Sequence, residues 1–450
     1  MNWVQGLVVA GGFALAGCVS AVGVDRNAAE SGPGYAVLKS LTTEVGARLA
    51  GSRKEAQARE WAVAKLASLG FVNVHEEPFA FHGWERGTGS AEVVGPVRIP
   101  LVMAALGGSV STPAGGITAR VAFVDSYDDL LKAAPGSFKG RIVYVNDHMV
   151  RARDGSGYGP AVRKRSKGAI EAARRGAIAV VIRSAGTDSN RFAHTGNLRY
   201  EAGVRQIPGI ALSGPDADQI ERLHATGRDI TLKLELRTRD VPHTVSGNVV
   251  ADIVGREYPD EIILLGAHLD SWDLGTGAID DGAGVGIIVG AALRAAGPDM
   301  KPKRTIRVVL FGAEEYTGGG NGAGTGGEAY AKSHAAEIAN HIVATEADFG
   351  AGAPWRYDTN VPASDLAFYE QIFDDLRPLG IERGKSQTDG GTDIEPLHKA
   401  GVRIISIAQD GTNYFDLHHT ANDTLDKVDP VTFELNVEAY ARAVSMVANQ

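Results

Sequence analysis

One stretch of the sequence, residues 264–284, concentrates groups that bind metal ions. It reads LLGAHLDSWDLGTGAIDDGAG, with one histidine and four aspartates but neither lysine nor arginine. Carboxylates crowded in this way repel one another and resist burial unless positive charge accompanies them. Further acidic or imidazole groups follow later apolar runs, at Glu314 and Glu315, at Asp348, and in LHHTANDT at residues 417–424. Such a set of groups, free of basic residues, is typical of a metal site.

The number of these groups exceeds what one divalent ion can use, so we expect two ions that share one carboxylate, as in two-metal hydrolases. Mixed histidine and carboxylate ligation without cysteine favours two zinc ions, with cobalt or manganese as substitutes. His268 and Asp270 lie two residues apart on one strand face, so Asp270 can orient His268 without binding metal itself. Asp280 follows across a glycine-rich loop, where it can bridge the ions.

Four apolar segments must bring these groups together, at residues 261–270, 305–315, 341–348 and 402–410. Helical stretches such as residues 283–297 lie between them. Nearly continuous apolar strands that alternate with helices predict an α/β fold with a mostly parallel central sheet flanked by helices. Binding sites in such sheets form beyond the carboxyl ends of the strands, which is where the His, Asp and Glu residues stand.

The chain has 450 residues, which predicts more than one domain or a domain with a large insertion. Residues 89–239 change to short β-like runs with interspersed helices and no cluster of metal ligands. We expect them to form an inserted β-rich domain, and they resemble the protease-associated domain of several exopeptidases. The catalytic domain is then expected at residues 35–88 and 240–450, preceded by a tether at residues 19–34.

Residues 1–18 indicate export. The apolar segment at residues 7–15 is too short to span a bilayer as a helix but suits a signal peptide. The sequence LAGC ends at Cys18, the only cysteine, and resembles a bacterial lipoprotein signal. The resemblance implies a lipid anchor at Cys18 and a periplasmic or cell-envelope location; a plain secretory signal is the alternative, because MNWVQ lacks lysine and arginine. A net charge of −9 argues against nucleic acid as the main partner.

Five motifs occur in a fixed order: GAHLDSWDLGTGAIDDGAG, PKRTIRVVLFGAEE, TEADFG, GGTDI and YFDLHHTANDTLDKVDP. They resemble the co-catalytic zinc exopeptidases, a family that includes bacterial aminopeptidases and glutamate carboxypeptidases, and they are closest to its carboxypeptidase Q branch. The likeness extends from about residue 36 to the C-terminus. It implies that Asp280 bridges two metal ions and that Glu314 is the general base. The remaining ligands implied are His268 and Asp348 for one ion, and Glu315 and His419 for the other.

The resemblance also assigns the histidine pair. In the family, the ligand stands four residues before the Asp of an Asp-Thr pair, which is Asp423–Thr424 here and selects His419 over His418. Several relatives have a tyrosine just before that histidine to stabilise an oxyanion, and either His418 or Tyr414 could replace it here. The family also tends to have a cis peptide after the bridging carboxylate. The candidate substrate contacts are Thr392, Asp393, Tyr414 and His418.

The leading hypothesis is a metal-dependent exopeptidase that acts on dipeptides or short peptides. Two cations would bring the pKa of a water between them toward neutrality, and Glu314 would move its proton to the leaving amine. Asp270 would support this catalysis by orienting His268. An N-terminal aminopeptidase of the same family, a non-catalytic receptor-like protein and a one-metal acyltransferase are the alternatives. The resemblance also makes a homodimer plausible.

Overall fold

The computed structural model describes residues 24–318 and 324–450, so the expected signal peptide and Cys18 lie outside the described residues. The strands are β1 (Val72–Gly95), β2 (Ile99–Leu101), β3 (Met103–Ala105), β4 (Ile117–Val124), β5 (Ile142–Val145), β6 (Ala179–Arg183), β7 (Gly209–Leu212), β8 (Thr231–Ile253), β9 (Tyr258–His268), β10 (Arg304–Phe311), β11 (His341–Glu346), β12 (Pro354–Asn360), β13 (Glu382–Arg383) and β14 (Ile404–Gln409).

The α-helices are α1 (Arg26–Ser31), α2 (Pro33–Ser40), α3 (Arg53–Ser68), α4 (Tyr127–Lys132), α5 (Tyr158–Arg174), α6 (Gly214–Ala225), α7 (Ala283–Ala296), α8 (Gly326–Ser333), α9 (Leu366–Leu376), α10 (Glu395–Lys399) and α11 (Pro430–Ala448). Short helical turns are η1 (Leu41–Val45), η2 (Ala278–Gly282), η4 (Ile338–Asn340), η5 (Arg377–Leu379), η6 (Tyr414–Asp416) and η7 (Leu425–Lys427). Within the described ranges, no helix combines the length and apolar character needed to cross a bilayer.

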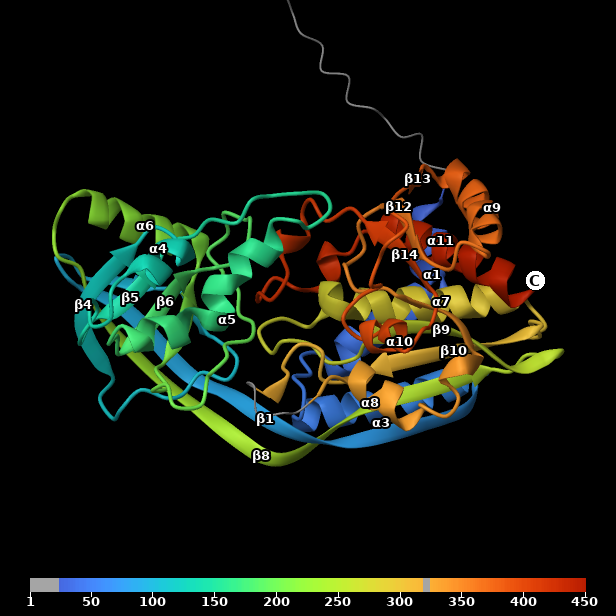
Figure 1. Ribbon diagram of the computed structural model, residues 1–450, viewed down its shortest axis with the longest axis horizontal. Coiled ribbons are helices and arrows are strands. Elements are labelled where there is room, and N and C mark those ends of the chain that lie inside the picture. Colours follow the sequence, from blue (N-terminus) through green and yellow to red (C-terminus); the bar gives the residue numbers. More distant parts are fainter. Residues whose placement is uncertain (1–23, 319–323) are drawn as a thin grey trace, which may run out of the picture.

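The chain forms two lobes that share the long antiparallel pair of β1 and β8. Figure 1 shows these two strands running beneath both lobes, with α4, α5 and α6 in one lobe and α7 to α11 in the other. The first half of β8 pairs with β4 of the inserted lobe, and its second half pairs with β10 of the catalytic lobe. Because the strands continue through the junction, the expected boundaries near residues 89 and 239 fall inside strands and not in linkers.

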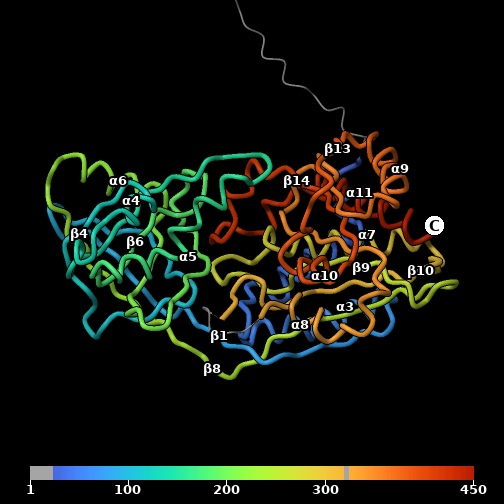
Figure 2. Tube along the Cα trace, viewed as in Figure 1, coloured from blue at the N-terminus to red at the C-terminus, as the bar shows by residue number. Residues whose placement is uncertain are grey.

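The sheet of the catalytic lobe is mostly parallel, as the sequence predicts. Its strand order is β13-β12-β14-β11-β9-β10-β8, and β9 runs parallel to both of its neighbours, β10 and β11. Strand β14 is parallel to β11, and β13 is parallel to β12, whereas β8 runs antiparallel to β10 and β12 runs antiparallel to β14. The carboxyl ends of β9, β10, β11 and β14 therefore meet at one edge of the sheet, on the side of the inserted lobe; Figure 1 gives the strand directions and Figure 2 the path of the chain between the lobes.

Apolar side chains cover both faces of this sheet, which explains why its strands are nearly continuous apolar runs. On β9, Ile263 and Leu265 belong to a large core with α2, α3, α7, α9 and α11. Leu264 points to the opposite face and packs in a smaller core with α8 and α10. Helix α7 begins very close to the strand ends, since a Cβ on Gly284 would lie 1.9 Å from the Ala347 carbonyl oxygen. Glycine is therefore required there.

The inserted lobe differs from the expected β-rich texture. Strands β4, β5, β6 and β7 are parallel to one another, and helices α4, α5 and α6 accompany them. All residues of β5, β6 and β7 are buried. Short strands buried on both faces need helices to cover them, so the lobe is a small α/β unit.

The tether expected at residues 19–34 is wrong for its described second half. Helix α1 begins after Asp25, whose side chain accepts a hydrogen bond from Ala28 N at 2.9 Å and caps the helix. Arg26 forms an ion pair with Asp429 at the start of α11, and Ala29 is buried. These contacts dock the segment on the catalytic lobe, and the sequence signal for them was only a short capped helix among polar residues.

Candidate active site

The register of the parallel strands brings the expected ligands together. Phe311 on β10 lies opposite His268 on β9, and Glu346 on β11 lies opposite Gly266. The segments that follow these residues therefore leave the sheet side by side. They carry the candidate ligands Glu315 and Asp348 to the position of His268.

Asp280 is the centre of this cluster. Its Oδ1 lies 3.2 Å from Nε2 of His268, and its Oδ2 lies 3.3 Å from Nε2 of His419. Nε2 of His268 is also 3.4 Å from Oδ1 of Asp348. Nε2 of His419 is also 2.8 Å from Oε2 of Glu315. The two oxygens of Asp280 thus face two different groups of candidate ligands.

The hydrogen bonds on the far side of each imidazole fit a metal site. Nδ1 of His268 donates to the Asp270 carbonyl oxygen at 3.0 Å, and Nδ1 of His419 donates to the Thr195 carbonyl oxygen at 3.2 Å. A carbonyl oxygen only accepts, so each ring carries a proton on Nδ1 and turns Nε2 toward carboxylates. Cations between these groups remove the repulsion. Asp280 Oδ2 is buried and receives no hydrogen bond from the described residues.

Charge also differs between the two histidines. Burial lowers the pKa of His419 to about 4, which keeps its ring neutral, as a metal ligand must be. For His268, burial opposes the charged form, but the carboxylates of Asp348, Asp270 and Asp280 raise its pKa well above the usual value. Without a cation, His268 therefore holds a proton among the carboxylates. A metal ion would replace that proton.

The loop that carries Asp280 is fixed by Asp423, a residue that the sequence used only as part of the Asp-Thr motif. The Asp423 carboxylate accepts hydrogen bonds from the backbone nitrogens of Ala278, Ile279 and Asp280 at 2.7, 2.5 and 3.3 Å. The Asp280–Asp281 peptide bond is cis, in agreement with the family resemblance. The Asp281 carboxylate accepts from His268 N at 3.2 Å and from Gly284 N at 3.0 Å.

The Asp270 side chain has a further role that the sequence did not predict. Its carboxylate lies 3.7 Å from Nδ1 of His268, while its backbone carbonyl orients that ring. The carboxylate instead accepts hydrogen bonds from Glu314 N at 3.1 Å and Glu315 N at 3.2 Å. Asp270 therefore holds the peptide that carries the proposed base and a proposed ligand. The sequence did not reveal this because the path of the chain after β10 is not periodic.

Glu314 stands next to this peptide with its side chain near the other carboxyl groups. Ala313 has a φ of +60°, a left-handed conformation that bends the chain directly after β10. Burial and the carboxylates of Asp348 and Asp393 raise the pKa of Glu314 to about 8. A carboxyl with a pKa near neutrality can both accept and return a proton, which is what general acid–base catalysis requires.

Part of the positive charge beside residues 264–284 comes from an arginine, which the sequence analysis did not predict. Arg48 is fully buried, and its guanidinium donates to the carbonyl oxygens of Thr276 and Gly277, both at 2.9 Å, and to that of Leu269. It therefore holds the loop between β9 and η2 from behind. No local signal in the sequence separates Arg48 from other arginines, because its partners lie more than 200 positions away.

The four candidate substrate contacts separate in the structure. Thr392 is exposed and lines a cavity of about 330 Å³ together with Asp348. Asp393 is fully buried and accepts a hydrogen bond from Gly327 N at 2.9 Å, so it supports the loop instead of facing a substrate. His418 stacks on His419 with 3.5 Å between ring centroids, and its Nε2 lies 3.4 Å from Oδ2 of Asp280.

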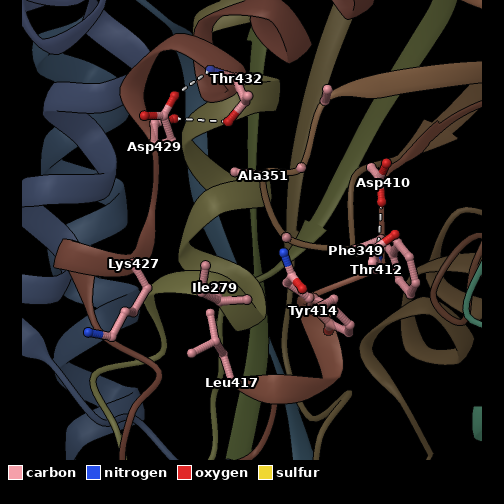
Figure 3. Close-up of a pocket in the computed structure, with 14 residues that line it drawn as sticks. Ile279, Phe349, Ala351, Asp410, Thr412, Tyr414, Leu417, Lys427, Asp429 and Thr432 are labelled. Atoms are coloured by element: carbon pink, nitrogen blue, oxygen red, sulfur yellow. Dashed lines mark hydrogen bonds between the residues drawn. The ribbon is translucent and has the colours of Figure 1, made fainter. Parts of the chain in front are cut away.

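Tyr414 lies away from the centre of the cluster. It is nearly buried, and its ring centroid is 5.0 Å from that of His418. Figure 3 shows it lining a second cavity, of about 450 Å³, with Ile279 and Leu417. The expected metal ligands do not line this cavity among the described residues, whereas Asp348 lines the smaller one. The smaller cavity is thus the one adjoining the cluster.

The fold and the cluster together define a class of protein. Histidines and carboxylates at the carboxyl edge of a mostly parallel sheet, with one carboxylate facing two ligand groups, are the arrangement of a metal-dependent hydrolase. Groups of His, Asp and Glu close enough to hold a metal ion include His268, Asp280 and Glu315, as well as Asp280, His418 and His419.

Comparison with known proteins specifies the family. Residues 248–444 match peptidase family M28. Human carboxypeptidase Q is 36% identical over 91% of this chain and 84% of its own length. A solved structure of a peptidase M28 precursor from Shewanella amazonensis SB2B has a TM-score of 0.90 and 45% identity, over 94% of this chain and 95% of that one. The chain belongs to peptidase family M28 and is a metallo-exopeptidase.

A more distant structure supports the fold. The zinc aminopeptidase BSAP from Bacillus subtilis has a TM-score of 0.66 and 19% identity, over 93% of this chain and 95% of that one. The α/β architecture is therefore common to this chain and to a peptidase of low sequence similarity.

Proposed function

We propose that this protein hydrolyses dipeptides or short peptides at a site that holds two zinc ions. The observation that supports this most directly is the position of Asp280, whose oxygens lie 3.2 and 3.3 Å from two histidines of separate ligand groups. The likeness to carboxypeptidase Q favours this activity over that of an N-terminal aminopeptidase. The zinc in BSAP supports the choice of metal.

The proposed ligands divide into two sets around Asp280. His268 and Asp348 form one set, and Glu315 and His419 form the other. The metal ions, when bound, supply the positive charge that acidifies water and polarises a peptide carbonyl group. Glu314 takes a proton from the attacking water and returns it to the leaving amine. Asp270 keeps Glu314 in place through the backbone.

The substrate is proposed to enter the cavity that Asp348 and Thr392 line. Its volume of about 330 Å³ is at the lower end of the range of roughly 300–1,000 Å³ for small-molecule pockets, which favours a short peptide. Asp154 of the inserted lobe lines the same cavity, so both lobes contribute to it. Rates on an unblocked dipeptide, an aminoacyl anilide and an N-blocked peptide test this proposal. We expect the dipeptide to be hydrolysed fastest. Rapid cleavage of the N-blocked peptide would contradict both the dipeptidase and the aminopeptidase specificity.

Metal analysis tests the two-ion proposal. We expect about two zinc ions per chain in the wild type and the loss of both in Asp280→Ala, because Asp280 faces both ligand sets. Asp273→Asn is the matched control: Asp273 lies on the same loop but forms an ion pair with Arg86 at 2.5 Å, outside the cluster. A wild-type content near one zinc, or normal content in Asp280→Ala, would contradict the proposal.

Three further proposals concern the whole protein. The inserted lobe is proposed to be a protease-associated-like domain, on the basis of its position in the chain and its strands.

Export through the N-terminal signal, with a lipid anchor at Cys18, is a second proposal and rests on the sequence of residues 1–18. The Shewanella relative is also described as a precursor. Metabolic labelling with a fatty acid, lost in Cys18→Ala, tests the anchor. Light scattering tests the proposed homodimer.

A further inference from the structure

A short segment of the inserted lobe, residues 194–197 between β6 and β7, contacts the candidate metal cluster. Arg165 of α5 in the same lobe also approaches the cluster, with Nη1 3.5 Å from Nδ1 of His419. We call this segment, His194-Thr195-Gly196-Asn197, the clamp segment. His194 and Thr195 are almost completely buried. The mechanism proposed above uses none of these residues, and their contacts show what they do.

Two residues of the clamp segment hold the histidine pair. Nδ1 of His194 donates to the His418 carbonyl oxygen at 2.8 Å. The backbone nitrogen of Thr195 donates to the His419 carbonyl oxygen at 3.0 Å. In return, the Thr195 carbonyl oxygen accepts from Nδ1 of His419 at 3.2 Å. Both the backbone and the ring of His419 are thereby fixed by the inserted lobe.

The same segment holds a second proposed ligand. The side-chain nitrogen of Asn197 donates to the backbone carbonyl oxygen of Glu315. Glu315 Oε2 lies 2.8 Å from His419 Nε2, so the clamp segment contacts two residues of one proposed ligand set: the backbone and ring of His419, and the backbone of Glu315.

The clamp segment is itself rigidly attached to its lobe. Nε2 of His194 lies 2.7 Å from Oδ1 of Asp188, and both side chains are buried. The Thr195 hydroxyl donates to the Ala105 carbonyl oxygen at 2.9 Å. Arg165 donates to the Thr195 carbonyl oxygen at 3.2 Å. Its guanidinium packs against Gly196, where a Cβ would lie 2.3 Å from Arg165 Cζ.

The other ligand set has no such support. Among the described residues, no hydrogen bond or ion pair joins the inserted lobe to the side chains of His268 or Asp348; Nδ1 of His268 donates to Asp270, in the catalytic lobe. We propose that the clamp segment positions His419 and Glu315, so that the inserted lobe controls the affinity for one of the two metal ions and not for the other.

This inference rests on the proposed two-metal function, and zinc titration of metal-free protein against a chelating dye tests it. We expect two binding steps in the wild type. In His194→Ala and Asn197→Ala, one of the two steps should lose about 10–100-fold in affinity, the range found when partners behind metal ligands are removed, while the other step is unchanged. In His194→Asn, the amide nitrogen can replace Nδ1 as donor to His418, and we expect most of the affinity to return.

Tyr200→Phe is the matched control. Its hydroxyl accepts a hydrogen bond from Val110 N at 3.0 Å and donates to the Ile207 carbonyl oxygen at 2.8 Å, wholly inside the inserted lobe. We expect both zinc affinities to match the wild type, even if thermal unfolding of the metal-free variant is shifted. The d–d absorption of cobalt-substituted protein provides a second readout, which should change in His194→Ala and not in Tyr200→Phe.

The outcomes separate the two proposals. If the wild type binds two zinc ions and His194→Ala and Asn197→Ala bind both unchanged, the role of the clamp segment is wrong and the two-metal function stands. Equal loss in Tyr200→Phe would also overturn that role, since any damage to the lobe would then suffice. If the wild type binds only one zinc ion per chain, the two-metal function itself is wrong.

Discussion

The Asp270 carboxylate accepts a hydrogen bond from the backbone nitrogen of Glu314 at 3.1 Å. A second one comes from Glu315 N at 3.2 Å, so both oxygens of one carboxylate hold the peptide that carries the proposed base. This role of the Asp270 carboxylate differs from the expected one, in which it would polarise the imidazole of His268. It links two strand ends, β9 and β10, and sets where Glu314 stands relative to the cluster.

Asp270→Asn should therefore lower kcat while leaving zinc bound. The amide has one oxygen, so one of the two backbone nitrogens loses its acceptor and the peptide shifts. We expect a loss of roughly 10–100-fold in kcat, as for other groups that orient a metal site. Steady-state kinetics and metal analysis on the same sample measure this, with Asp273→Asn as the control. An unchanged kcat would show that the peptide does not need this support.

Glu314→Gln should retain both zinc ions and lose nearly all hydrolysis. The amide keeps the size of the side chain but cannot accept and return a proton, a function that contributes roughly 10²–10⁴-fold in rate. The burial that raises the pKa of Glu314 to about 8 means that its charge state changes near neutral pH when no cation is present. Single-turnover hydrolysis of a dipeptide provides the measurement. Full activity in this variant would exclude Glu314 as the base.

The contacts that the sequence could and could not predict have different physical origins. His268, Glu315 and Asp348 follow apolar strands, and the carboxyl ends of parallel strands must meet, so their convergence was predictable. His194 and Asn197 reach the cluster only after β1 and β8 bring the inserted lobe across it. Such contacts depend on how two lobes close, and neither periodicity nor spacing in the sequence encodes that.

The contacts of Arg48 in the catalytic lobe could not be predicted from the sequence either. Removing this side chain should destabilise the protein. Its guanidinium is fully buried, and burial lowers its pKa, while the Asp423, Asp270, Asp281 and Asp280 carboxylates oppose that shift by favouring its charge. In Arg48→Met, these carboxylates lose a buried counter-charge and the loop carbonyls lose their donor. We expect a loss of about 3–5 kcal/mol in the free energy of unfolding.

Denaturant unfolding of the metal-free protein measures this effect, because bound zinc would add its own stabilisation. Arg53→Met is the control, since Arg53 is an exposed residue at the start of α3. Its change should stay within about 0.5 kcal/mol. Equal free energies of unfolding for the two variants would mean that the stability of the protein does not depend on the charge and hydrogen bonds that Arg48 gives to the loop.

Zinc affinity should rise with pH through the neutral range. In the metal-free protein, burial opposes charge on His268, but Asp348, Asp270 and Asp280 raise its pKa well above the usual value, so at pH 7 the ring holds a proton. Burial and the Asp280 carboxylate also raise the pKa of Glu315. Zinc must displace these protons, so the apparent affinity increases by about tenfold per pH unit for each proton released.

His419 should contribute nothing to this dependence, because burial lowers its pKa to about 4 and its ring is already neutral. Calorimetric titrations at pH 6, 7 and 8, each in two buffers of different ionisation enthalpy, count the protons released. We expect at least one proton per chain at pH 7 and an affinity that still increases between pH 7 and 8. A ligand set with ordinary histidines, whose pKa is about 6.5, would instead reach nearly constant affinity above about pH 7.5. Such a plateau would show that the carboxylates do not hold a proton on His268.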